Sequence, residues 1–158
     1  MTKFLLAVHV IVAIVAIGPV TVAASMFPPT ARKALAEPGD AQTLATTRLL
    51  HRICQVYATV SVAVPVFGFA TANNMGVLGD TWLIVSMALT ALAAVVLAAL
   101  VLPRQASIME GIWDAGGRAV TVTPRATAQL AMFTGIFNLL WATVTVLMII
   151  RPGSTTGA

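Results

Sequence analysis

The stretch that decides the fold runs from residue 81 to residue 102 and reads TWLIVSMALTALAAVVLAALVL, without one charged side chain. A helix needs about 20 mostly apolar residues to cross the roughly 30 Å hydrocarbon core of a bilayer. Three other stretches, at 4–26, 53–72 and 126–150, are also long enough and contain no Asp, Glu, Lys or Arg. The sequence therefore predicts four membrane-spanning segments.

The composition of the whole chain agrees with these segments. The 158 residues are 59% hydrophobic and only 9% charged, and the mean hydropathy is +0.96. A soluble domain is about 45–50% apolar and about 25% charged, so that class is excluded. Backbone groups in a bilayer must pair internally, and the alternating ten-residue segments of a β-barrel are absent. We expect an all-α polytopic membrane protein, with residues 1–158 forming one domain of four transmembrane helices in an up-down bundle.

The connections carry signals for further helices. Pro28-Pro29 is expected to end the first helix, and a short interfacial helix follows it before Pro38-Gly39. Asp40 is a suitable N-cap for the next helix. A second interfacial helix is expected at 105–115, after Pro103. Each of the two long loops thus contains one short helix, and the tail at 151–158 is expected to be flexible.

The basic residues indicate the orientation in the membrane. Of nine Lys and Arg, four lie in the loop 27–52 and three in the loop 103–125. Cytoplasmic loops retain such an excess, so both loops are expected in the cytoplasm and both termini outside it. Anionic phospholipids attract cations beside a membrane, and the arginines expected to contact their headgroups are Arg48, Arg52, Arg104 and Arg125. The basic residues are not interleaved with aromatic ones, so nucleic acid is not an expected partner.

The N-terminus also has the features of a secretory signal. A positive start and an apolar run precede Val22-Ala23-Ala24, a sequence that resembles a cleavage site. The apolar run continues to Met26, however, and exceeds the 7–15 residues of a signal peptide core. A retained first span is the favoured interpretation.

Few residues have the types needed for chemistry. No carboxylate lies within the four spans, and no nucleophile with a nearby base, phosphate loop or cysteine metal cluster is present; Cys54 is the only cysteine. The predicted spans place His9 toward the outer side and His51 toward the cytoplasm, too far apart to share one haem. We therefore expect no catalytic residue, no metal site and no cofactor. A single axial haem ligand from His9 remains open.

Two of the spans carry distinctive packing faces. In the third span a ridge of small residues recurs every four positions, at Ser86, Thr90, Ala94 and Ala98. In the fourth span one helix face carries Thr134, Asn138, Trp141 and Thr145. Small and polar residues of this kind join transmembrane helices to one another. They serve packing within this bundle or a contact with other membrane protein subunits.

The layout resembles that of a known group of proteins. The opening residues Lys3 to Val10, the Gly18-Pro19 pair, the basic first loop and the four spans resemble small four-helix bacterial membrane proteins of unknown function. The low lysine content, with abundant Ala, Val, Arg and Thr, is similar to that of actinobacterial membrane proteins. Some of that group are accessory subunits of the respiratory supercomplex of cytochrome bc and cytochrome oxidase.

The resemblance implies a multi-pass protein of the bacterial inner membrane and a non-catalytic accessory or assembly subunit, and it assigns no role to any residue. Two alternatives remain open. One is a haem- or ion-handling membrane protein centred on His9, and the other is a small oligomeric permease.

Overall fold

A computed structural model describes residues 2–114 and 123–153, and the described residues form helices and turns without a β-strand. Four helical stretches are long and apolar enough to cross a membrane. They are Thr2–Ala36, Ala41–Met75, Thr81–Ile112 and Pro124–Ile150. The predicted all-α fold with four helices of membrane-spanning length is confirmed for the described part of the chain.

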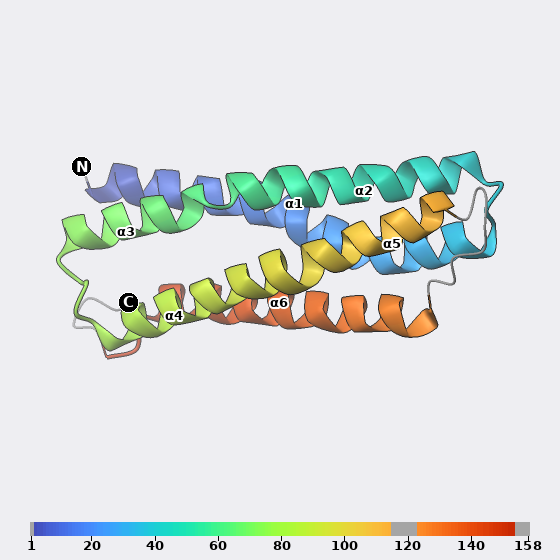
Figure 1. Cartoon of the computed structure of the whole chain (residues 1–158). Coiled ribbons are helices and arrows are strands. Elements are labelled where there is room, and N and C mark those ends of the chain that lie inside the picture. Colours follow the sequence, from blue (N-terminus) through green and yellow to red (C-terminus); the bar gives the residue numbers. More distant parts are fainter. Residues whose placement is uncertain (1, 115–122, 154–158) are drawn as a thin grey trace.

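The four stretches are built from seven elements that lie roughly side by side (Figure 1). In chain order these are α1 (Thr2–Ala36), α2 (Ala41–Val60), α3 (Ala63–Met75), α4 (Thr81–Val95), the π-helix η1 (Val96–Val101), α5 (Leu102–Asp114) and α6 (Pro124–Ile150). Figure 1 shows the start of α1 and the end of α6 at the same end of the bundle. The α1–α2 connection and the start of α6 lie at the opposite end.

Pro28-Pro29 does not end the first helix, because α1 continues through both prolines to Ala36. Hydroxyl groups pair with backbone carbonyls on either side: Ser25 Oγ donates to Thr21 O at 2.7 Å and Thr30 Oγ1 donates to Met26 O at 2.8 Å. Phe27 and Pro28 are also buried in the bundle. The two prolines alone predict the end of a helix at this point. Packing against the rest of the bundle keeps this segment helical.

The third predicted span also continues past its expected end. α4, η1 and α5 follow one another without a break, so the helix expected at 105–115 is a continuation of the span as far as the structure describes it. Pro103 lacks an N–H, and in an α-helix its ring would clash with the carbonyl of Ala99. The wider turns of η1 immediately before Pro103 relieve this clash. Residues 115–122, including the expected end of that helix, and most of the predicted flexible tail fall outside the described residues.

The second span is interrupted between α2 and α3. Pro65 has no N–H to donate to the carbonyl of Ser61, and the chain makes a turn at Ser61 and Val62. The backbone N–H of Val64 donates to Ser61 O at 3.0 Å instead, and Ser61 Oγ donates to Tyr57 O at 2.6 Å. The interruption agrees with a proline kink at Pro65.

Two of the helical stretches are longer than a bilayer needs. Thr2–Ala36 and Ala41–Met75 each contain 35 residues. At 1.5 Å per residue each is about 50 Å long, against roughly 30 Å of hydrocarbon. The surplus lies at the end with the basic residues, where Arg32, Lys33 and Arg48 occur. The helical bundle therefore extends beyond its apolar part at that end.

α1 is the central helix of the bundle and packs against α2, α3, α5 and α6. Its buried side is rich in alanine, with Ala16, Ala23, Ala24, Ala31 and Ala34 all buried. Such small side chains let neighbouring backbones approach closely, which is how helices associate in a membrane.

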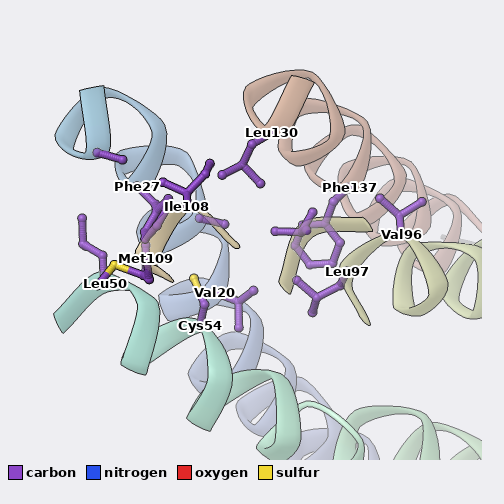
Figure 2. Close-up of a cluster of buried hydrophobic side chains, with 14 of the residues drawn as sticks. Val20, Phe27, Leu50, Cys54, Val96, Leu97, Ile108, Met109, Leu130 and Phe137 are labelled. Atoms are coloured by element: carbon purple, nitrogen blue, oxygen red, sulfur yellow. The ribbon is translucent and has the colours of Figure 1, made fainter. Parts of the chain in front are cut away.

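The largest group of buried apolar side chains contains residues of every helix except α3, and it joins α1 and α2 to α4, η1, α5 and α6. In Figure 2, Phe137 of α6 lies beside Leu97 of η1, and Phe27 of α1 lies near Ile108 and Met109 of α5. All five side chains belong to this one core cluster. The cluster holds the long α4–η1–α5 helix between α1 and α6.

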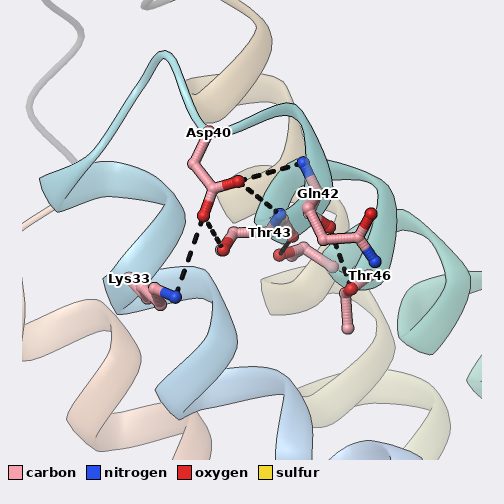
Figure 3. Close-up of polar contacts among 6 residues, drawn as sticks. Lys33, Asp40, Gln42, Thr43 and Thr46 are labelled. Atoms are coloured by element: carbon pink, nitrogen blue, oxygen red, sulfur yellow. Dashed lines mark hydrogen bonds and ion pairs between the residues drawn. The ribbon is translucent and has the colours of Figure 1, made fainter.

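Asp40 begins α2 as predicted (Figure 3). One carboxylate oxygen accepts hydrogen bonds from the backbone N–H groups of Gln42 and Thr43 at 3.0 and 3.2 Å. The other accepts from the Thr43 hydroxyl and lies 3.8 Å from Lys33 Nζ. The hydrogen bond from the Thr43 side chain, followed by that from its backbone, lowers the pKa of Asp40 below its ordinary value.

We expect the Asp40 cap to make stability depend on pH in the acid range. Because the pKa of Asp40 is lower in the folded protein, its contribution is complete above the unfolded value of about 3.9. The contribution disappears as pH falls through the lower folded pKa. Melting curves in detergent between about pH 6 and pH 3 should show a smaller acid-side loss of stability in Asp40→Asn than in the wild type. Equal losses in the two proteins would contradict this assignment.

Candidate functional site

The histidine of the first span lies against the backbone of α3. His9 Nδ1 is 3.1 Å from the carbonyl oxygen of Val64. A Cβ atom at Gly68 would stand 3.0 Å from His9 Cε1, so the absence of a side chain at Gly68 permits this approach. The hydrogen bond, made when Nδ1 carries the proton, joins α1 to α3 beside the Pro65 interruption.

The role of His9 as a haem ligand stays a prediction. With Nδ1 directed at Val64, coordination would use Nε2. Within residues 2–114 and 123–153, no group of three His, Cys, Asp or Glu side chains is placed to hold a metal ion.

The small-residue ridge of the third span divides between two environments. Ser86 is buried and Thr90 half-buried, and their hydroxyls donate to Trp82 O and Ser86 O, each at 2.8 Å. Ala94 and Ala98 are exposed. A step of four residues advances about 40° beyond a full α-helical turn, so within α4 the ridge winds from the buried Ser86 to the exposed Ala94, and it ends at the exposed Ala98 of η1.

The polar face of the fourth span is likewise divided. Thr134 is buried, Asn138 and Trp141 are half-buried, and Thr145 is exposed with its hydroxyl donating to Trp141 O at 2.9 Å. Three buried atoms of this face have no hydrogen-bond partner among the described residues. They are Thr134 Oγ1, Asn138 Oδ1 and Trp141 Nε1.

An exposed polar contact joins α6 to α1. Asn138 Nδ2 donates to Ser25 Oγ at 3.0 Å, and Ser25 Oγ donates to Thr21 O at 2.7 Å. A Cβ atom at Gly18 or at Gly135 would meet nothing within 4 Å. We call the small and polar residues that share these two helix faces the α1–α6 seam: Gly18, Thr21, Ser25, Gly135, Asn138 and Ala142.

A second polar cluster, which the sequence did not predict, lies between α2 and α5. Gln105 is completely buried. Its Oε1 is 3.3 Å from His51 Nδ1, and its Nε2 donates to Cys54 Sγ at 3.4 Å. The His51 ring lies 6.1 Å from the ring of Phe27 on α1. This cluster joins three helices at the basic end of the bundle.

The sequence did contain a signal for the burial of Gln105. It lies three and four residues before Ile108 and Met109, which are both buried. Gln105 therefore belongs to the apolar stripe of α5 by its position. It was missed because Gln105 is the first residue of the interfacial helix expected at 105–115, where a polar side chain is typically exposed at the membrane surface.

The four predicted headgroup arginines occupy different environments. Arg48 and Arg52 are exposed on α2, and Arg125 is exposed in the first turn of α6. Arg104 is half-buried, with its guanidinium 4.4 Å from the centre of the Phe133 ring and Nη1 donating to Leu100 O at 3.1 Å. Arg104 thus also joins α5 to α6.

These features define the class of the protein. It is an all-α protein with four helices of membrane-spanning length and polar contacts between them. Comparisons with protein-family models, curated proteins and solved structures find no match.

We predict that Gly68→Ala destabilises the protein by about 1 kcal/mol, because the new methyl group displaces the His9 ring from the Val64 carbonyl. Gly135→Ala is the control, and the higher helix propensity of alanine should leave stability unchanged or raise it by up to about 1 kcal/mol. Denaturant titration in mixed micelles, followed by circular dichroism, measures both. In a His9→Ala background the cost of Gly68→Ala should vanish, and a cost that persists would show that the ring is not responsible.

We predict that Gln105→Ala lowers the stability of the protein more than Gly68→Ala does. The substitution leaves His51 Nδ1 and Cys54 Sγ without their partner inside the bundle and should cost about 2–3 kcal/mol in the same titration. Gln129→Ala, on the exposed side of α6, should change stability by less than about 0.5 kcal/mol. Similar values for the two variants would contradict a structural role for Gln105.

Proposed function

We propose that this protein is a non-catalytic accessory or assembly subunit of a larger membrane protein complex, and that it joins the complex through the α1–α6 seam. The observation that carries this proposal is the exposed hydrogen bond between Asn138 and Ser25, which lies well inside the apolar parts of α6 and α1. Lipid chains offer no hydrogen bond to such a pair.

The seam has the properties of a helix-docking surface. Gly18 and Gly135 leave open space on the same helix faces as the polar pair, so another backbone can approach closely. Glycine and other small residues, together with Ser, Thr and Asn, are the residue types that join helices in membranes. The proposed occupant is therefore a transmembrane helix of another subunit.

The proposed orientation follows from the basic residues. We place the four helices across the membrane in an up-down arrangement, with the loops 27–52 and 103–125 in the cytoplasm and both termini outside. The exposed arginines Arg48, Arg52 and Arg125 would then stand at the inner surface with Arg104, beside anionic headgroups.

The resemblance to small actinobacterial membrane proteins points to a particular setting. We propose the respiratory supercomplex of cytochrome bc and cytochrome oxidase in the bacterial inner membrane as the first complex in which to look for this subunit. The seam itself carries no information about which complex is involved.

The test is affinity purification of the tagged protein in mild detergent from its native membrane. We expect a defined set of membrane proteins to co-purify with the wild type. Gly135→Leu fills the open space of the seam and should reduce their recovery about tenfold, equivalent to about 1.4 kcal/mol.

Ala91→Leu, on the exposed side of α4, is the matched control and should not change recovery. Recovery of the wild type as a monodisperse protein without partners would contradict the proposed function. Recovery of the protein as an oligomer of itself would show that the seam binds a second copy of this chain and not another subunit. Loss of recovery in Ala91→Leu alone would assign the contact to α4 and not to the seam.

A further inference from the structure

Three polar groups on the inner side of α6 have no hydrogen-bond partner among the residues that the structure describes. Thr134, Asn138 and Trp141 lie at positions i, i+4 and i+7, which share one helix face. Thr134 Oγ1, Asn138 Oδ1 and Trp141 Nε1 are buried, with no hydrogen-bond partner in the part of the chain that the structure describes. Buried polar groups in native proteins are nearly always paired, so this face requires a partner.

Thr134 differs from the other hydroxyl residues of the same helix. Thr143 and Thr145 donate to the carbonyls four residues earlier, at 2.8 and 2.9 Å, as hydroxyls in helices commonly do. The Thr134 hydroxyl makes no such bond, although the residue is only 2% exposed. Its donor and acceptor capacity is therefore available inside the bundle.

The orientation of the Asn138 amide follows from Ser25. The Ser25 hydroxyl already donates to Thr21 O, so its oxygen can only accept from Asn138. This places Nδ2 toward Ser25 at 3.0 Å and leaves Oδ1 as the unpaired acceptor. A flipped amide would set two acceptors against each other.

Trp141 supplies the complementary donor. Its ring packs among the apolar side chains of Ala16 and Ile17 on α1 and Val64 on α3, and it meets the Phe137 ring nearly edge-on at 6.4 Å. None of these side chains can accept a hydrogen bond from the indole N–H. The donor is thus held in an apolar interior by packing alone.

One backbone carbonyl of α1 also lacks its usual helical donor. Pro28 has no N–H to donate to the carbonyl of Ala24, which is buried and precedes Ser25, the partner of Asn138. The inner side of α6 thus combines one acceptor, one donor and one hydroxyl that both donates and accepts.

We propose that a water molecule binds between α1 and α6 and is held by Trp141, Asn138 and Thr134. It accepts a hydrogen bond from Trp141 Nε1–H, donates to Asn138 Oδ1, and uses its remaining capacity on the Thr134 hydroxyl. Buried waters typically make about three hydrogen bonds to polar groups that otherwise lack partners. The site does not depend on the proposed role in a complex.

The first test is NMR spectroscopy of the full chain in lipid nanodiscs, with indole-¹⁵N tryptophan and the Trp141 signal assigned by Trp141→Phe. We expect a direct dipolar cross-peak between the Trp141 indole proton and water. Thr134→Val and Asn138→Leu should each weaken this peak at least about twofold by removing one of about three hydrogen bonds to the water. Absence of the cross-peak, or a cross-peak that neither variant changes, would overturn the proposal.

The second test uses the sign of a change in Tm. Thr134→Val replaces the hydroxyl by a methyl group of similar size. If the hydroxyl binds water, the variant loses that bond and its Tm should fall by about 2–4 °C. If the hydroxyl is merely unpaired, the methyl group is better accommodated and Tm rises. Thr143→Val, on the exposed side of α6, serves as the control for general effects of the substitution. An unchanged or raised Tm of Thr134→Val relative to this control would overturn the proposal.

Discussion

A bilayer interior offers no hydrogen-bond partners, and this single constraint accounts for how the chain treats its prolines. Each proline removes one backbone donor. In α1 the helix continues through Pro28-Pro29, where Phe27 and Pro28 are packed in the bundle interior. Before Pro103 the helix widens into η1, and before Pro65 it is interrupted at Ser61 and Val62. The chain thus accommodates its prolines in three ways, by packing in α1, by π-helical geometry before Pro103 and by a break in the helix before Pro65.

The apolar nature of the bilayer also explains why α1 is suited to be the central helix. Lipid chains are as apolar as leucine, so helices in a membrane associate through close packing and not through removal of apolar surface from water. The buried alanines of α1 allow this close packing against α2, α3 and α6. Large side chains of the partners, such as Phe137 and Leu130, then fill the core beside it.

The sequence predicted the four spans because length and apolar composition alone determine that property. It did not predict where the helices end, because Pro28-Pro29 and Pro103 are tolerated only through packing and π-helical geometry. It predicted the polar face of α6 but could not divide it into an inner and an outer part, since that depends on where α1 and α3 lie. Gln105 was recognisable only from its spacing to Ile108 and Met109, and its bonds to His51 and Cys54 depend on the pairing of α2 with α5.

Asn138 belongs to both of the sites that we propose on α6. Its Nδ2 faces Ser25 at the exposed seam, and its Oδ1 faces the interior beside Thr134 and Trp141. The amide is planar and rigid, so the side chain cannot rotate to change one contact without moving the other. A helix that docks at the seam and bonds to Ser25 or to Nδ2 would therefore alter the position of the inner oxygen. The proposed docking at the outer surface and the proposed hydration of the interior would in this way be coupled through one side chain.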